Sequence, residues 1–162
     1  YGASSGGVVI RNGHLYSATP EGEVCVLYAD GTMKTYAAGA FDAEEAMAAG
    51  AWQAWDFGPA LVEDGQALTQ FRSRISANNP RTAIGYYEPG HYCFVVVDGR
   101  QEDSDGMSLS ALAALFQELG CKEAYNLDGG KSLAMVFNGS LVNDPADGGR
   151  RLSDIVYIAE VG

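Results

Sequence analysis

The chain has 162 residues, of which 47% are hydrophobic, and its formal net charge at neutral pH is −11. This size and composition support one folded domain over residues 1–162, and no apolar run reaches the ~20 residues of a membrane helix. The acidic charge argues against nucleic acid or an anionic membrane surface as a partner, so an anionic ligand would need a local cluster of cations.

The first third of the sequence predicts two hairpins and one short helix. The dipeptides Asn-Gly at 12–13 and Asp-Gly at 30–31 each separate two apolar runs, which is a strong hairpin signal. Asp42 is the expected N-cap of the helix, with Glu45 at the capping-box position and Gly50 just beyond the end.

The next stretch is less regular. The aromatic cluster at 52–57 suits a core or a sheet edge better than a sugar platform, and residues 59–68 predict another ribbon. Residues 71–80 are polar and irregular, and we expect a mobile loop there. The three cysteines, Cys25, Cys93 and Cys121, lack metal-site spacing and are expected to be buried thiols, with one disulfide left open.

The second half allows a geometric prediction. The runs 81–87 and 91–97 should form a hairpin around Pro89, which places Arg81 opposite Val97 and beside Asp98. A helix from Ser108 to about residue 119 and a strand at 123–127 follow, and such a crossover makes its two strands parallel. We therefore predict an α+β domain with a mixed, mostly antiparallel sheet, hairpins, one strand–helix–strand crossover and a few covering helices.

This topology brings polar groups to one edge of the sheet. Asp98 and Asp128 follow the two parallel strands, the helix N-terminus at Ser108 opens at the same edge, and Arg81 arrives from the hairpin. The Gly-Gly-Lys-Ser run at 129–132 adds backbone N–H groups, a cation and a hydroxyl. The sequence therefore predicts a site for an anionic or polar ligand.

Several competing interpretations are weaker. A phosphate loop would need a glycine at Tyr125 and a helix after Lys131, whereas residues 133–137 before Asn138-Gly139 predict a strand. The acidic run 102–106 lacks EF-hand spacing and predicts a solvated loop, and His14 and His91 fall in strands. The polar loop 143–151 either closes over the site or connects strands, and a last strand is expected at 155–159.

Four segments, taken in order, resemble the phosphodiester glycosidase family over roughly residues 8–160. The segments are 79–85 (NPRTAIG), 95–100 (VVVDGR), 106–109 (GMSL) and 126–132 (NLDGGKS). Lys131 replaces the third glycine of the family's last motif, which bears on the size or charge of the ligand. The resemblance also places an Asn-Gly-Asp-like segment of the family upstream of Tyr1, outside this chain.

The resemblance implies a secreted hydrolase that cleaves a sugar-1-phosphodiester, of the N-acetylglucosamine-1-phosphate type, into a free sugar and a phosphomonoester. Asp98 and Asp128 are the expected catalytic carboxylates, with the roles of nucleophile and base open, as are retention and inversion. The expected substrate-binding residues are Arg81, Thr82, Gly99, Ser108, Asn126, Gly129, Gly130, Lys131 and Ser132.

The implied partner is a phosphorylated glycan or sugar phosphodiester, in an extracellular or cell-envelope location. We expect no transition metal and no cofactor, with calcium as the one metal that two aspartates would suit. Two alternatives stay open: a non-catalytic glycan-binding or envelope module of the same fold, and a glycosidase that acts on unphosphorylated envelope polysaccharide. The sequence does not indicate an oligomeric state.

Overall fold

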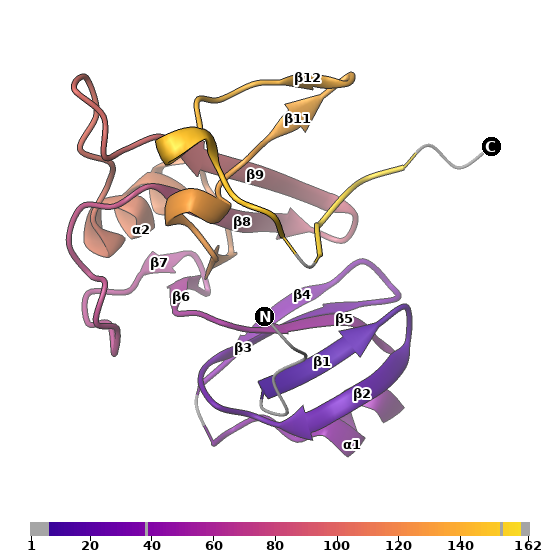
Figure 1. Cartoon of the computed structure of the whole chain (residues 1–162). Helices are drawn as coiled ribbons and strands as arrows, with labels where there is room; N and C mark the ends of the chain where they lie inside the picture. The colour runs from indigo at the N-terminus through magenta and orange to yellow at the C-terminus, as the bar shows by residue number, and fades with distance from the viewer. Residues whose placement is uncertain (1–6, 38, 153, 160–162) are drawn as a thin grey trace.

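The computed structural model describes residues 7–37, 39–152 and 154–159, and its strands form two five-stranded sheets and one two-stranded sheet (Figure 1). The first sheet has the order β2-β1-β5-β3-β4 and the second β7-β6-β10-β8-β9. Every strand pairing in the described residues is antiparallel. The predicted α+β class, with mostly antiparallel strands, is confirmed.

The first sheet is built from hairpins, as predicted. It contains β1 (Gly7–Arg11), β2 (His14–Thr19), β3 (Val24–Tyr28), β4 (Met33–Tyr36) and β5 (Ala51–Asp56). Asn12 and Gly13 both have positive φ, which is the twist that a two-residue hairpin turn requires. The helix α1 (Ala43–Ala48) starts where Asp42 accepts the Glu45 N–H at 2.9 Å. The prediction missed β5, a central strand that pairs with both β1 and β3.

The second sheet carries the crossover. It contains β6 (Ala60–Glu63), β7 (Gln66–Ala67), β8 (Arg81–Glu88), β9 (His91–Val97) and β10 (Glu123–Leu127). The predicted hairpin register is confirmed, because Arg81 pairs with Val97. Helix α2 (Leu109–Glu118) joins β9 to β10, and these two strands run in the same direction on either side of β8.

The layers follow from the alternation of side chains along each strand. One face of the second sheet packs against α2 through a cluster that includes Leu112 and Phe116. Its other face packs against the first sheet through a cluster that includes Met33 and Tyr125, and α1 covers the outer face of the first sheet. The Tyr125 hydroxyl ties the two sheets together, since it donates to Glu23 O at 2.6 Å and accepts from Phe57 N at 2.8 Å.

Cys93 of β9 and Cys121, which lies between α2 and β10, are close together, with their Sγ atoms 3.7 Å apart as free thiols. Cys121 Sγ occupies the space above Gly85, where a Cβ would come within 2.7 Å of it. Cys25 is also a free thiol and is buried. In the described part of the chain, no helix is long and apolar enough to cross a membrane.

The last third departs from the prediction in two places. Residues Gly130–Ser132 form a 3-10 turn (η1), and the strand expected at 133–137 shrinks to β11 (Val136–Phe137), paired with β12 (Ser140–Leu141). Residues 154–159 contain no strand, although a strand was expected at 155–159. A second 3-10 turn, η2, spans Ala146–Gly148.

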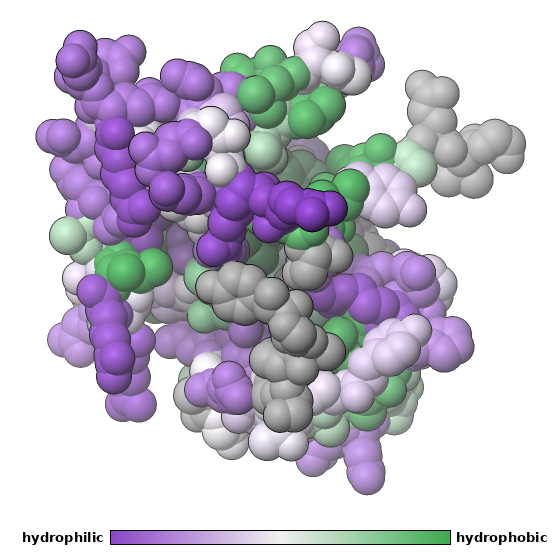
Figure 2. Space-filling view, in the orientation of Figure 1, coloured by the Kyte–Doolittle hydropathy of each residue, from purple (hydrophilic) through white to green (hydrophobic). Residues whose placement is uncertain are grey.

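Both regions expose large apolar side chains. Figure 2 shows hydrophobic residues gathered at the top of the view, over β11 and β12. The exposed apolar residues of the hairpin and of the last described segment are Val136, Phe137, Leu141, Val142, Ile155, Val156, Tyr157 and Ile158. In these segments the β propensity of the sequence is not matched by burial, which explains why periodicity alone overpredicted strands.

Candidate functional site

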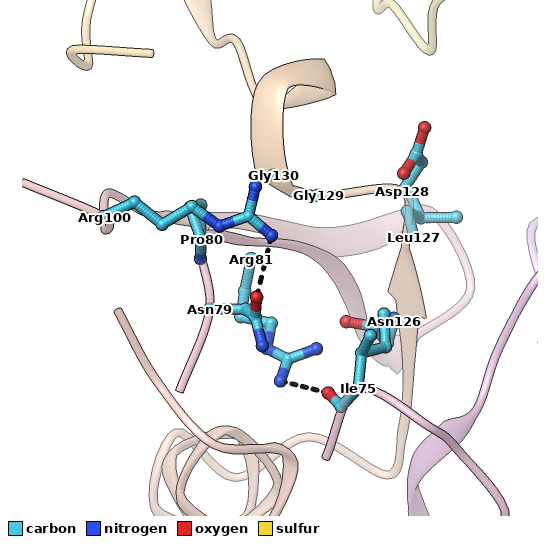
Figure 3. Close-up of a pocket in the computed structure, with 10 residues that line it drawn as sticks. All are labelled: Ile75, Asn79, Pro80, Arg81, Arg100, Asn126, Leu127, Asp128, Gly129 and Gly130. Carbon is cyan, nitrogen blue, oxygen red and sulfur yellow. Dashed lines mark hydrogen bonds between the residues drawn. The ribbon is translucent and has the colours of Figure 1, made fainter. Parts of the chain in front are cut away.

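A small cavity lies where β8 begins and β10 ends, on the face of the second sheet that α2 covers (Figure 3). Its volume is about 110 Å³. The residues that line it come from the loop before β8, from the start of β8, from the segment after β9, and from the end of β10 and the segment that follows it. They are Ile75, Asn79, Pro80, Arg81, Arg100, Asn126, Leu127, Asp128, Gly129 and Gly130.

Arg81 forms the buried side of the cavity, with only 2% of its surface exposed. Its Nε donates to Met107 O at 2.8 Å, and its Nη2 donates to Ile75 O at 2.6 Å and to Ala77 O at 2.5 Å. Burial lowers the pKa of this guanidinium. Arg81 therefore ties the 75–81 loop to the entry of α2, and two of its three nitrogens are already engaged.

Asn126 faces Arg81 from β10 and is 1% exposed. Its backbone N–H donates to Pro59 O at 3.0 Å, and its Nδ2 donates to Gly58 O at 2.8 Å. Its Oδ1 has no hydrogen-bond partner among the described residues. Buried side-chain oxygens without a partner are uncommon in folded proteins, so this atom marks the cavity as a polar site.

Asp128 provides the carboxylate of the cavity. Its Oδ2 accepts from Ser132 Oγ at 2.6 Å and from Arg150 Nη2 at 2.6 Å, and the side chain is 48% exposed. These two hydrogen bonds fix one oxygen of the carboxylate, because both bonds are short and one of the two donors is charged. The 143–151 loop, which carries Arg150, thus contacts the site. Of the two roles left open for this loop, the contact favours closing over the site rather than only connecting strands.

Arg100 approaches the cavity from the segment after β9. Its Nη2 donates to Asn79 Oδ1 at 2.9 Å, and its Nη1 lies 3.4 Å from the point where a Cβ on Gly130 would be (Figure 3). Arg100, unlike Arg81, is exposed and has a left-handed backbone (φ 59°) directly after Asp-Gly. The cavity is therefore cationic on two sides, in a protein that is acidic as a whole.

Three glycines allow the backbone segments around the cavity to stack. A Cβ on Gly129 would lie 2.3 Å from Pro80 O, one on Gly106 would lie 2.3 Å from Asn79 O, and one on Gly99 would lie 2.6 Å from Gly106 Cα. No side chain fits at such distances. The glycines of the sequence motifs are therefore packing residues, which bring the separate motifs into contact.

The structure places the predicted site residues in three groups. Arg81, Asn126, Asp128, Gly129 and Gly130 line the cavity. Ser132 does not line it, but its hydroxyl is bonded to Asp128. The others lie elsewhere: Thr82, Asp98, Gly99, Ser108 and Lys131.

Asp98 instead holds the 143–144 loop. Its Oδ1 accepts from Asn143 Nδ2 at 2.8 Å and its Oδ2 accepts from Asp144 N at 2.9 Å, so both carboxylate oxygens are used within the protein. Lys131 pairs with Asp147 at 2.8 Å, and this pair joins η1 to η2. In this structure Asp98 and Lys131 therefore contact other loops of the protein and do not line the cavity, and their expected role at the ligand stays a prediction.

Strand alternation removes Thr82 from the cavity. Arg81 and Ala83 face α2, whereas Thr82 follows Ile84 and Tyr86 on the face toward the first sheet. One of the N–H groups expected to bind the ligand is also occupied by a protein carbonyl, since Gly130 N donates to Pro80 O at 3.1 Å.

At the start of α2, two N–H groups of the predicted anion site are hydrogen-bonded within the protein. Leu109 N donates to Ser76 O at 3.0 Å, and Ala111 N donates to the Ser108 hydroxyl at 3.2 Å. Ser108 is therefore an N-cap, whose oxygen satisfies an N–H of its own helix. Its predicted contact with a ligand stays a prediction.

Sequence reasoning missed Arg100, Asn79 and Arg150 as site residues. Asn79 and Arg100 lie inside two of the four segments that carry the family resemblance, and this was the available signal for them. Arg150 gave no such signal, because its position depends on the fold of the 143–151 loop. Among the described residues, no group of three or more His, Cys, Asp and Glu side chains is arranged to hold a metal; the expectation of a metal-free site stays a prediction.

Comparison with known proteins supports the family resemblance that these motifs indicate. The sequence profile described as "Phosphodiester glycosidase" matches residues 1–159. The SPbeta prophage-derived uncharacterized protein YomE of Bacillus subtilis (strain 168) is 33% identical over 150 residues, which cover 88% of this chain and 23% of that protein. The N-acetylglucosamine-1-phosphodiester alpha-N-acetylglucosaminidase of Bos taurus is 31% identical over 109 residues, which cover 62% of this chain and 20% of the bovine enzyme.

A solved structure shows the same fold. It is the catalytic domain of the zebrafish N-acetylglucosamine-1-phosphodiester alpha-N-acetylglucosaminidase, described as auto-inhibited by its pro-peptide. It superposes with a TM-score of 0.71 at 25% sequence identity and covers 91% of this chain and 53% of that chain. The chain thus spans less than a quarter of the two curated relatives and about half of the solved domain.

Proposed function

The chain belongs to the phosphodiester glycosidase family, and from this premise we propose that it hydrolyses a sugar-1-phosphodiester to a free sugar and a phosphomonoester. The observation that carries the proposal is one carboxylate, Asp128, in a small cavity that two guanidinium groups, Arg81 and Arg100, also line. Cations beside a carboxylate suit a ligand that brings a phosphate to a nucleophile or base.

A single carboxylate is enough for this reaction. An ordinary glycosidase needs a second carboxylic acid to protonate the departing oxygen. A phosphate monoester is already a stable anion and leaves the anomeric carbon without that proton. Both carboxylate oxygens of Asp98 accept hydrogen bonds from the 143–144 loop. This is compatible with turnover, because nothing in this scheme requires a general acid.

We assign the catalytic charge to Asp128. Its Oδ2 is fixed by Ser132 and Arg150, so Oδ1 is the oxygen that attacks the anomeric carbon or takes the proton of the attacking water. Each role leads to a different product anomer, since covalent attack by Asp128 retains the configuration and activation of water inverts it. The anomer released first, followed by proton NMR, assigns the role.

We assign the phosphate to Arg100. Its side chain is exposed and is held by one hydrogen bond to Asn79, so it can turn toward a ligand at the edge of the cavity. Arg81 lacks this freedom, because a fork-like contact with phosphate through two of its nitrogens would break at least one of its bonds to backbone carbonyls. The substrate that fits this scheme is a phosphorylated glycan of the cell envelope or the extracellular space.

Two chromogenic substrates test the proposal: an N-acetylglucosamine-1-phosphodiester with a nitrophenyl leaving alcohol, and the matching plain nitrophenyl glycoside. We expect turnover of the first when a phosphatase releases the dye, and none of the second. Asp128→Asn should lower kcat by at least about a thousandfold and leave binding intact or tighter, because it removes a negative charge that repels the anion. Asp103→Asn, in the exposed loop after β9, is the control and should retain full activity.

The other results identify the alternatives. Cleavage of the plain glycoside alone would support a glycosidase for unphosphorylated polysaccharide. Binding of the phosphodiester without turnover would support a glycan-binding module. An active Asp128→Asn variant would refute the assignment of the catalytic charge.

A further inference from the structure

The buried end of the cavity contains a hydrogen-bond acceptor that the protein itself leaves unused. Asn126 is 1% exposed, and its Oδ1 has no partner in the part of the chain that the structure describes. The amide cannot be reversed without loss, because its Nδ2 donates to Gly58 O at 2.8 Å and a flip would place two oxygens against each other. Oδ1 must therefore face away from Gly58, and Asn126 lines the cavity.

Arg81 places a donor next to this acceptor. Figure 3 shows an oxygen of Asn126 directed toward the Arg81 guanidinium. Nε and Nη2 donate to the carbonyls of Met107, Ile75 and Ala77, which leaves Nη1 as the nitrogen that can serve a ligand. The buried end of the cavity thus combines one neutral acceptor and one charged donor.

These two atoms discriminate between the groups that a sugar phosphodiester carries. A phosphate oxygen accepts hydrogen bonds but donates none, so it would satisfy Arg81 and leave a negative oxygen against Asn126 Oδ1. A hydroxyl donates and accepts, so it satisfies both atoms at once. Leaving a buried polar atom unpaired is the basis on which such a site rejects a ligand that lacks the matching group.

We propose that the buried end of the cavity binds a hydroxyl group of the sugar, which donates to Asn126 Oδ1 and accepts from Arg81 Nη1. The inference rests on the proposed function, because it takes the ligand to be a sugar phosphodiester. It makes Asn126 a specificity-determining residue and orients the substrate, with the sugar hydroxyl inward and the phosphate outward at Arg100.

Binding experiments with neutral sugars test this without relying on turnover. The probes are the methyl α-glycoside of N-acetylglucosamine and its singly deoxygenated derivatives, one for each hydroxyl, titrated by NMR into the wild-type protein. We expect one derivative to bind at least about tenfold more weakly than the parent and the others to bind almost equally. Inorganic phosphate should bind at the same time as the parent glycoside and should not displace it.

The variant Asn126→Leu tests whether the discrimination between the parent glycoside and its derivatives comes from the Asn126 acceptor. It should bind the parent and the sensitive derivative with equal affinity, because the acceptor that distinguishes them is gone. Asn143→Leu is the matched control: this asparagine lies outside the cavity with both amide atoms bonded, and its loss should keep the wild-type ratio of affinities. If Asn126→Leu does not fold, the derivatives on the wild-type protein still decide.

The possible failures are separable. Equal binding of all derivatives, absence of glycoside binding, or displacement of the glycoside by phosphate would overturn the inference, even if the phosphodiester were hydrolysed. The expected pattern of binding without hydrolysis would support the inference and refute the catalytic proposal alone.

Discussion

Replacement of Arg81 by lysine should cost stability before it costs catalysis. The guanidinium makes three hydrogen bonds to the carbonyls of Ile75, Ala77 and Met107, and it is 2% exposed. Lysine keeps the charge but places it on a single nitrogen, which cannot span carbonyls on two different segments.

The size of the effect follows from these contacts. Hydrogen bonds that involve a charged group contribute about 1.5–3 kcal/mol each, and carbonyls left without a donor in a buried site add to the loss. If lysine recovers one of the three bonds, two are lost and the free energy of unfolding should fall by roughly 3–6 kcal/mol. This is a large fraction of the ~5–15 kcal/mol that stabilises a typical domain.

Urea denaturation followed by circular dichroism measures the loss, and an unchanged m-value would show that the folded state remains compact. Arg100→Lys is the matched control, since Arg100 is exposed and donates to the side chain of Asn79 rather than to buried carbonyls. It should change stability by less than about 1 kcal/mol. An Arg81→Lys variant that unfolds like the wild type would refute the structural role and return Arg81 to the ligand.

Two further predictions concern the frame of the site. Gly129→Ala should lower the free energy of unfolding by roughly 2–4 kcal/mol, because its Cβ would lie 2.3 Å from Pro80 O; Gly139→Ala, with open space around it but φ 75°, should lose only about 1 kcal/mol in the same urea titration. Asp147 has its pKa lowered by the hydrogen bond and charge of Lys131, so its contribution to stability is present above the ordinary carboxyl pKa and is lost as the pH falls through the lowered value. Asp147→Asn should therefore lower the denaturation midpoint at about pH 7 and match the wild type at about pH 2, and a constant difference across this range would contradict the ion pair.

Much of the fold could be predicted from local signals. Hairpin turns, caps and the register that pairs Arg81 with Val97 depend on neighbouring residues, and these predictions are confirmed. β5 was missed because its aromatic residues do not follow a simple alternation, and the predicted strand at 155–159 failed because β propensity requires a partner strand.

The site was harder to predict than the fold. Topology brought Arg81 and Asp128 to one cavity, but it could not show whose hydrogen-bonding groups were already occupied. Asp98 and Ser108 carry suitable groups at the expected edge, yet loop contacts and capping use them. Such competition between ligand and protein for the same polar atoms is decided by tertiary contacts, which a motif does not record.

The position of Tyr125 next to Asn126 on β10 links correct folding to the presence of the site. Consecutive residues of a strand face opposite ways, so the tyrosine ring enters the core between the sheets while the asparagine amide enters the cavity. A slip of β10 by one residue would place the amide in the apolar core and the ring beside Arg81. A molecule with β10 paired one residue out of register would therefore lack the site, so it would be inactive rather than altered in specificity.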